Sequence, residues 1–224
     1  MNIKTATNIQ AILFDLDGTL ISTLEVTEQV YSTHALQYNI DPQAIIDFCH
    51  GVPTLQVLQK FFPPTTHTKE YAETLELQAV NMLEGLRVIP GARQLVDSLV
   101  PGTWAIFTSG LPKLAVPRMR YLEIPVPGVL ITPQDVSRGK PFPEGYCLAA
   151  ERLGKDVDRC VVFEDAPAGI KAGVDAGALV IGVRTLLDHE SLKHAGALFT
   201  VKDMTKVRVE YTGNEMTVFI DESD

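Results

Sequence analysis

Long apolar runs are absent from this sequence. The longest apolar segments, such as residues 160–163 and 178–181, have the length of β-strands. The first ten residues contain no apolar stretch as long as that of a signal peptide. We therefore expect a cytoplasmic protein with no membrane partner.

Cysteine and basic residues are also scarce. The three cysteines, Cys49, Cys147 and Cys160, have no metal-type spacing, and their odd number fits a reducing compartment. Lys and Arg number 19 against 28 Asp and Glu, which gives a formal charge of −9. Because nucleic acids are bound by clustered cations, we expect no nucleic-acid partner. A monomer that binds a small molecule is the expectation.

The apolar residues that are present form strand-length runs separated by helix-length segments. The runs lie at residues 9–14, 103–107, 128–132, 160–163 and 178–183. Helix-length segments, each opened by proline or glycine, lie at residues 91–100, 112–121, 143–153 and 167–175. This alternation predicts an α/β fold with a Rossmann-like parallel sheet covered on both faces.

One long interval breaks the alternation. Between Leu20 and Arg87 the sequence has helical periodicity and no β-branched apolar run, and Pro63 and Pro64 divide its helices. A chain of 224 residues has room for one substantial core and a smaller module. We predict a core domain of residues 1–21 and 87–224, ending in a hairpin, and an inserted all-helical cap domain of residues 22–86.

Reactive residues follow the predicted strands directly. In chain order they are Asp15 and Asp17, then Thr108, Ser109 and Gly110, then Glu164 and Asp165, with Lys140 in a loop before a predicted helix. The carboxyl ends of parallel strands meet at one edge of a sheet, so these side chains should converge. This set is typical of a phosphoryl-transfer site.

Charge repulsion points to a bound metal. The carboxylates of Asp15, Asp17 and Asp165 would repel one another in a partly buried cleft unless a divalent cation lay between them. Oxygen ligands without a His or Cys cluster favour Mg²⁺ over zinc.

The same residues supply the groups that phosphoryl transfer requires. A carboxylate such as Asp15 can attack phosphorus once metal and Lys140 offset its charge, and Asp17 can carry the proton of the leaving group. Thr108, with the amides of Ser109 and Gly110, would hold the phosphoryl oxygens.

Each segment also has an ordinary structural interpretation. The Asp15 to Gly18 segment alone is more often a solvated turn, and Thr108 and Glu164 alone are more often helix caps. A lone Lys140 would be a surface lysine. Only the four segments in order favour chemistry.

Four motifs give the chain a family resemblance over nearly its whole length. FDLDGTL, FTSG, RGKPFPEGY and VVFEDAPAGIKAG resemble the ordered motifs of the haloacid dehalogenase superfamily. The helical insertion after the first motif resembles the subfamily of sugar-phosphate phosphatases and beta-phosphoglucomutase. The resemblance implies that Asp15 is the nucleophile and Asp17 the general acid/base. It further implies a magnesium site formed by Asp15, Asp17 through its backbone carbonyl, Glu164 and Asp165.

A closer resemblance includes the predicted cap. CHGVPTLQVLQKFFP, together with the terminal VRVEY hairpin, resembles fungal glycerol-phosphate and 2-deoxyglucose-6-phosphate phosphatases. It implies that His50 and Thr54 contact a small sugar or polyol phosphate, although His50 could instead be an ordinary helix-end residue. Val52 and Pro53 stand where those relatives typically carry arginine, so the substrate could differ.

Other activities remain as alternatives. Asp17 argues against a dehalogenase, because halide release needs no proton donor. A beta-phosphoglucomutase-like mutase is the enzymatic alternative, although Thr27 stands where the mutases' cap histidine is expected. A phosphonatase would need a desolvated cap lysine, but Lys60 and Lys69 stand among polar or proline-rich neighbours. A catalytically silent binding protein would have no reason to keep Asp15, Asp17, Thr108, Lys140 and Asp165 together.

Overall fold

The computed structural model describes residues 3–49, 52–213 and 215–223. The chain divides into two compact units. The larger consists of Met1–Ser22 and Val88–Asp224, and the smaller of Thr23–Arg87. The interval predicted from the sequence, residues 22–86, differs from the smaller unit by one residue at each end.

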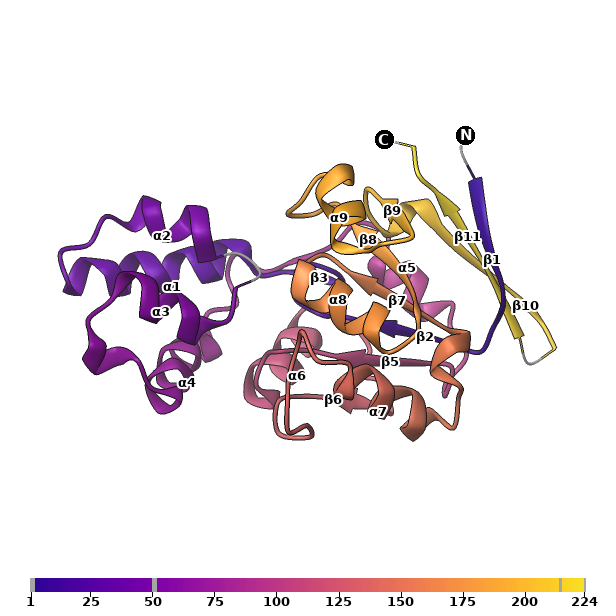
Figure 1. Ribbon diagram of the computed structural model, residues 1–224, viewed down its shortest axis with the longest axis horizontal. Coiled ribbons are helices and arrows are strands. Elements are labelled where there is room, and N and C mark those ends of the chain that lie inside the picture. Colours follow the sequence, from indigo (N-terminus) through magenta and orange to yellow (C-terminus); the bar gives the residue numbers. More distant parts are fainter. Residues whose placement is uncertain (1–2, 50–51, 214, 224) are drawn as a thin grey trace. The chain divides into compact units, whose positions relative to one another are not determined.

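A six-stranded parallel sheet forms the centre of the larger unit, in the order β6-β5-β2-β7-β8-β9 (Figure 1). The strands are β2 (Ala11–Phe14), β5 (Trp104–Phe107), β6 (Leu130–Ile131), β7 (Cys160–Glu164), β8 (Leu179–Val183) and β9 (Phe199–Val201). Strand β2 lies between β5 and β7, with Phe14 paired to Ile106 and Phe163. The predicted α/β class is confirmed, and the carboxyl ends of three strands meet at one edge.

Helices cover both faces of this sheet because its strands are apolar on both sides. Along β2, Ile12 and Phe14 belong to one buried cluster, and Ala11 and Leu13 belong to the other. Helices α5 (Ala92–Asp97) and α6 (Pro112–Tyr121) contribute to the first cluster. The second includes residues of α7 (Glu144–Leu153), α8 (Pro167–Asp175) and α9 (His189–Ala195). Burial on both faces explains why the strands read as unbroken apolar runs.

A second sheet adds a layer to the first cluster. Strands β1 (Ile3–Ile9), β11 (Glu215–Asp221) and β10 (Val207–Thr212) are antiparallel, and β1 and β11 lie side by side (Figure 1). The hairpin of β10 and β11 is confirmed. The predicted strand at residues 9–14 was wrong in extent, because Ile9 ends β1 and β2 begins at Ala11. The polar residues of β1 concealed a strand that its pairing with β11 stabilises.

Helices form the smaller unit, as predicted. They are α1 (Leu24–Gln37), α2 (Pro42–Cys49), α3 (Thr54–Phe61) and α4 (Lys69–Leu77). Short 3₁₀ helices are η1 (Pro64–Thr66) and η2 (Gln78–Asn81) here, and η3 (Val157–Arg159) and η4 (Met204–Lys206) in the larger unit. Strands β3 (Ile21–Ser22) and β4 (Arg87–Val88) pair where the chain passes between the units. Among the described residues, no helix has the length and apolarity needed to cross a membrane.

Candidate active site

Asp15 lies immediately after β2, at the start of a tight loop. Its amide donates to the carbonyl of Phe163 at 3.0 Å, and the Gly18 amide donates to the carbonyl of Ile21 at 2.7 Å. Gly18 has φ +97°, and a Cβ at this position would lie 2.0 Å from Oδ2 of Asp165. The loop therefore requires glycine here, and it brings the first strand's backbone against the acidic end of β7.

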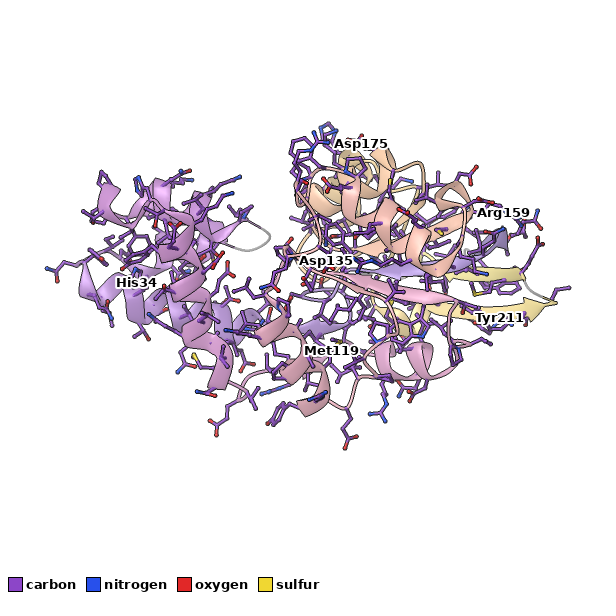
Figure 2. The ribbon with its side chains drawn as sticks, turned by 90° about the horizontal axis from the view of Figure 1, so that it is seen from below. His34, Met119, Asp135, Arg159, Asp175 and Tyr211 are labelled. Carbon is purple, nitrogen blue, oxygen red and sulfur yellow. The ribbon has the colours of Figure 1, made fainter. Side chains whose placement is uncertain are left out.

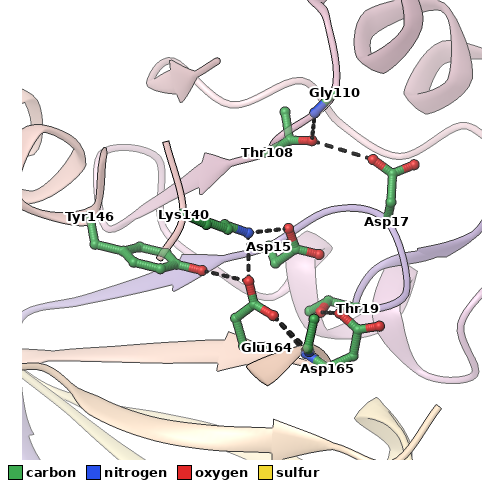
Figure 3. Close-up of polar contacts among 10 residues, drawn as sticks. Asp15, Asp17, Thr19, Thr108, Gly110, Lys140, Tyr146, Glu164 and Asp165 are labelled. Atoms are coloured by element: carbon green, nitrogen blue, oxygen red, sulfur yellow. Dashed lines mark hydrogen bonds and ion pairs between the residues drawn. The ribbon is translucent and has the colours of Figure 1, made fainter. Parts of the chain in front are cut away.

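Three carboxylates meet beside a buried lysine (Figure 3). Asp15, Glu164 and Asp165 are buried, and one oxygen of each lies within 4.8 Å of the others. Lys140 Nζ donates to Asp15 Oδ1 and to Glu164 Oε1, both at 2.5 Å. Burial lowers the pKa of Lys140, but Asp15 and Glu164 outweigh this effect and raise it above its usual value. Lys140 therefore stays charged within the group.

Glu164 has hydrogen-bond partners at both carboxylate oxygens. Besides Lys140, Oε1 accepts from the hydroxyl of Tyr146 at 3.3 Å, while Oε2 accepts from the amides of Asp165 at 2.9 Å and Ala166 at 3.0 Å. A Cβ at Gly169 would lie 1.6 Å from Oε1, so the first turn of α8 has glycine where Glu164 crosses it. Glu164 thus connects Lys140 to the start of α8, where amide groups favour negative charge.

The remaining oxygens fit a hard divalent cation. Oδ2 of Asp15 and Oδ2 of Asp165 are buried among the described residues without a hydrogen-bond partner, while Oδ1 of Asp165 accepts from the Thr19 hydroxyl at 3.5 Å. Burial raises the pKa of Asp15 and of Asp165, and neighbouring carboxylates add to both shifts. A divalent cation would favour the charged forms and complete the unpaired oxygens. Asp15, Glu164 and Asp165 could therefore hold a metal ion.

The Asp17 side chain points away from this acidic group (Figure 3). Its Oδ2 accepts from the Thr108 hydroxyl at 3.3 Å, and its Oδ1 accepts from Nη1 of Arg118 at 3.2 Å. Thr108 Oγ1 also accepts from the Gly110 amide at 2.9 Å, and Ser109 between them is exposed. The loop after β5 thus connects to the loop after β2 through Asp17.

The formal charges of the site leave room for one divalent cation. Its carboxylates are Asp15, Asp17, Glu164 and Asp165, and its cations are Lys140 and Arg118. With every group ionised, four negative charges face two positive ones. The excess of two negative charges equals the charge of one Mg²⁺ ion.

Two residues of the predicted cap, His50 and Thr54, were expected to contact the substrate. His50 lies outside the described residues. Thr54 begins α3 in the smaller unit. The proposed substrate contacts of both residues stay predictions.

Sequence reasoning missed two residues that contact the site. Tyr146 lies six positions after Lys140 on α7, and its place at the end of the RGKPFPEGY motif was the available signal. Arg118 could not be separated from Arg120 and Arg138 by sequence. Only Arg118 of these three is buried, because it lies on the apolar face of α6.

Residues 9–177 match the haloacid dehalogenase-like hydrolase family. The chain belongs to this family. It is 38% identical to 2-deoxyglucose-6-phosphate phosphatase 1 of Saccharomyces cerevisiae, over 88% of this chain and 89% of the yeast protein. Identity to hexitol phosphatase A of Escherichia coli K12 is 37%, over 80% and 85% of the two chains.

Solved structures of haloacid dehalogenase-like proteins share the fold. A family hydrolase from Deinococcus radiodurans R1, solved with bound phosphate and sodium, superposes with TM-score 0.68 and 27% identity, over 88% of this chain and 93% of that one. The family resemblance that the motifs predicted is therefore confirmed, and the chain is a hydrolase of the haloacid dehalogenase-like family.

Proposed function

We propose that this chain is a Mg²⁺-dependent phosphatase that hydrolyses a small sugar or polyol phosphate through an aspartyl-phosphate intermediate on Asp15. The observation that carries the proposal is the buried group of Asp15, Glu164, Asp165 and Lys140, in which two carboxylate oxygens lack partners. A buried excess of negative charge that no cation offset would only destabilise the fold.

Asp15 is the nucleophile in this scheme. Lys140 holds Oδ1 at 2.5 Å, which fixes the carboxylate and offsets part of its charge. Attack forms a bond between a carboxylate oxygen of Asp15 and phosphorus while the bond from phosphorus to the ester oxygen breaks. The site is buried, so Lys140 acts on the developing charge with little screening by water.

Asp17 moves the proton in both halves of the reaction. It donates a proton to the departing ester oxygen, which leaves as an alcohol. It then takes a proton from the water that attacks the phosphorylated Asp15, and this second step releases phosphate and restores both carboxyl groups. In this scheme Thr108, which hydrogen-bonds to Asp17, and the Ser109 amide hold phosphoryl oxygens.

Asp15 and Asp165 would supply side-chain oxygens for magnesium, with Glu164 beside them in the acidic group, and the backbone carbonyl of Asp17 is a further ligand that we propose. Bound magnesium would neutralise charge on the transferring phosphoryl group. Glu164, with all its bonds to protein groups, orients Lys140 and the end of β7 beside this site.

The substrate class comes from the relatives. Proteins named as 2-deoxyglucose-6-phosphate phosphatase and hexitol phosphatase are 38% and 37% identical to this chain. Both names describe small phosphorylated carbohydrates or polyols. We assign substrate selection to residues 22–86 as a cap, with His50 and Thr54 as contacts.

The test is phosphate release from a panel of hexose, hexitol and glycerol phosphates, with Mg²⁺ or with EDTA. The wild-type enzyme should release phosphate from a few members of the panel when Mg²⁺ is present and from none in EDTA. Asp15→Asn should lose at least about 1000-fold of kcat, because it removes the nucleophile. Asp175→Asn is the matched control, since this carboxylate pairs with Lys171 on the surface of α8 and should retain wild-type activity.

Three results would contradict the proposal. Turnover in EDTA would exclude the metal, and activity retained by Asp15→Asn would exclude the nucleophile. Isomerisation of glucose 1-phosphate without phosphate release would instead indicate a mutase.

A further inference from the structure

Arg118 is a buried arginine on the apolar face of α6. The buried residues of this helix are Leu114, Ala115, Arg118 and Met119, so the arginine stands in a stripe of core positions. It is 8% exposed, and its Nη1 donates to Oδ1 of Asp17 at 3.2 Å. Its Nε is buried without a partner in the described part of the chain.

This arrangement carries an energetic cost. Removing a guanidinium from water costs several kcal/mol, and a single pair with Asp17 is a modest compensation. An apolar residue at this position would complete the core stripe of α6. Arg120, two positions along the same helix, is exposed and shows where a merely solubilising arginine lies. A purely structural role therefore does not account for the buried charge at Arg118.

The contacts of Asp17 indicate what the charge does. Thr108 donates to one carboxylate oxygen of Asp17 and Arg118 to the other, at 3.3 and 3.2 Å. Two donors on opposite oxygens fix both the position and the plane of a carboxylate. Asp17 is thereby held by the loop after β5 and by α6, in addition to its own loop.

We propose that Arg118 is a positioning residue that holds the Asp17 carboxyl group for proton transfer to the leaving group. The inference rests on the phosphatase function proposed above. In the step concerned, the proton passes from the Asp17 carboxyl to the ester oxygen as the phosphorus–oxygen bond to that oxygen breaks and Asp15 bonds to phosphorus. Arg118 neither touches phosphorus nor exchanges a proton.

The chemistry of the leaving group separates this role from a structural one. An alkoxide leaving from a hexose or hexitol phosphate needs a proton, whereas 4-nitrophenolate leaves without one. The parameter to compare is kcat/KM, because it reports the steps up to departure of the leaving group. A loss of folded protein would lower kcat/KM equally for the two substrates.

The first variant is Arg118→Met, which keeps an unbranched apolar side chain without the charge. The second is Arg118→Lys, which keeps a positive charge without the planar guanidinium group. Arg120→Ala is the control on the exposed side of the same helix. We expect Arg118→Met to lose roughly 10- to 100-fold of kcat/KM on the alkyl phosphate, since displaced catalytic groups cost this much. The loss on 4-nitrophenyl phosphate should stay below about 3-fold, because that substrate bypasses general-acid catalysis. Arg118→Lys should fall between Arg118→Met and wild type, and Arg120→Ala should match wild type.

A double-mutant cycle removes any dependence on protein yield. In an Asp17→Asn background, Arg118→Met should change the ratio of the two kcat/KM values no further, because the positioned group is already lost. An additive effect in that background would overturn the inference.

The two proposals fail in different ways. If wild type hydrolyses phosphate esters and Arg118→Met loses activity equally on both substrates, the positioning role is wrong and the phosphatase function stands. If wild type hydrolyses neither substrate with Mg²⁺, both proposals are overturned.

Discussion

Two buried polar clusters in this chain differ in charge. In the larger unit, Asp15, Glu164 and Lys140 are buried as ionic groups, with side chains 8%, 1% and 7% exposed. In the smaller unit, His34 is 2% exposed, lies between the helices (Figure 2) and contacts the Tyr71 hydroxyl at 3.3 Å. Tyr71 in turn hydrogen-bonds to Tyr38 at 3.0 Å.

The difference lies in how each cluster meets the cost of burial. Burial lowers the pKa of His34, so the histidine stays neutral beside the rings of Tyr38, Phe62 and Tyr71. In the acidic cluster Lys140 offsets part of the negative charge, and burial raises the pKa of Asp15 and of Asp165, whose Oδ2 atoms lack partners. Each cluster has buried atoms without a hydrogen-bond partner in the described part of the chain, Nδ1 of His34 in one and the Oδ2 atoms of Asp15 and Asp165 in the other. A neutral ring nitrogen costs less to leave unpaired than a carboxylate oxygen does, so only the acidic cluster requires a cation. This contrast separates a structural role from a chemical one.

The largest effect on stability is expected for Glu164→Gln. The carboxylate of Glu164 accepts from Lys140 at one oxygen and from two backbone amides at the other. The NH₂ group of glutamine would replace one of these acceptors with a donor, so one set of hydrogen bonds must be lost. We expect the free energy of unfolding to fall by about 2 to 4 kcal/mol, as for a broken buried ion pair. Equilibrium unfolding in urea measures this loss of stability.

Glu123→Gln is the control for that variant. Glu123 is 80% exposed and pairs with Arg93 at the surface, so its change should stay below about 0.5 kcal/mol. If both substitutions lowered the free energy of unfolding equally, the hydrogen bonds of buried Glu164 would contribute no more to stability than a surface ion pair does.

A smaller destabilisation is expected for Gly169→Ala. Alanine normally stabilises a helix interior relative to glycine by up to about 1 kcal/mol. Here the added Cβ would lie 1.6 Å from Oε1 of Glu164, so the carboxylate must move. We expect a loss of about 1 to 3 kcal/mol in the unfolding free energy, together with lower phosphatase activity. Gly128→Ala is the control, because a Cβ there meets no atom within 4 Å. Stabilisation by Gly169→Ala would contradict the observed packing.

The smallest effect concerns the neutral cluster and its pH dependence. Because burial lowers the pKa of His34 below 6.5, the unfolded chain takes up a proton more readily than the folded one as pH falls. The contribution of neutral His34 to the unfolding free energy is fully present above pH 6.5. It decreases below that pH, by at most about 1.4 kcal/mol per pH unit.

Between pH 6.5 and 5, replacing His34 with Phe should remove the part of the pH dependence that lowers the unfolding free energy as pH falls, while the opposite contribution of Asp15 and Asp165, whose pKa values are raised, stays. The exposed residue His194, replaced with Asn, is the control and should leave the wild-type slope unchanged. Chemical denaturation at several pH values measures the slopes. An identical slope in His34→Phe would show that the histidine is not held neutral by burial.

Most of the parallel core was predictable because its signals are local. Helices α6 and α8 have the bounds predicted from proline starts and apolar spacing, and the five predicted runs each overlap a strand of the parallel sheet. Strand β9 and helix α9 were missed, since three and seven residues are too short to establish a period. Strand β1 was missed because its stability comes from pairing with β11, about 210 positions later along the chain.

The sequence by itself determined which reactive residues follow which strands, because strand-length runs and the residues after them are adjacent in the chain. It also determined the family, through four ordered motifs. Only the tertiary structure decided that Glu164 is bonded at both oxygens, that Asp17 faces Thr108, and that Arg118 is buried while Arg120 is exposed. The physical reason is that these differences depend on side chains from distant elements competing for the same oxygens, and on which face of α6 meets the core.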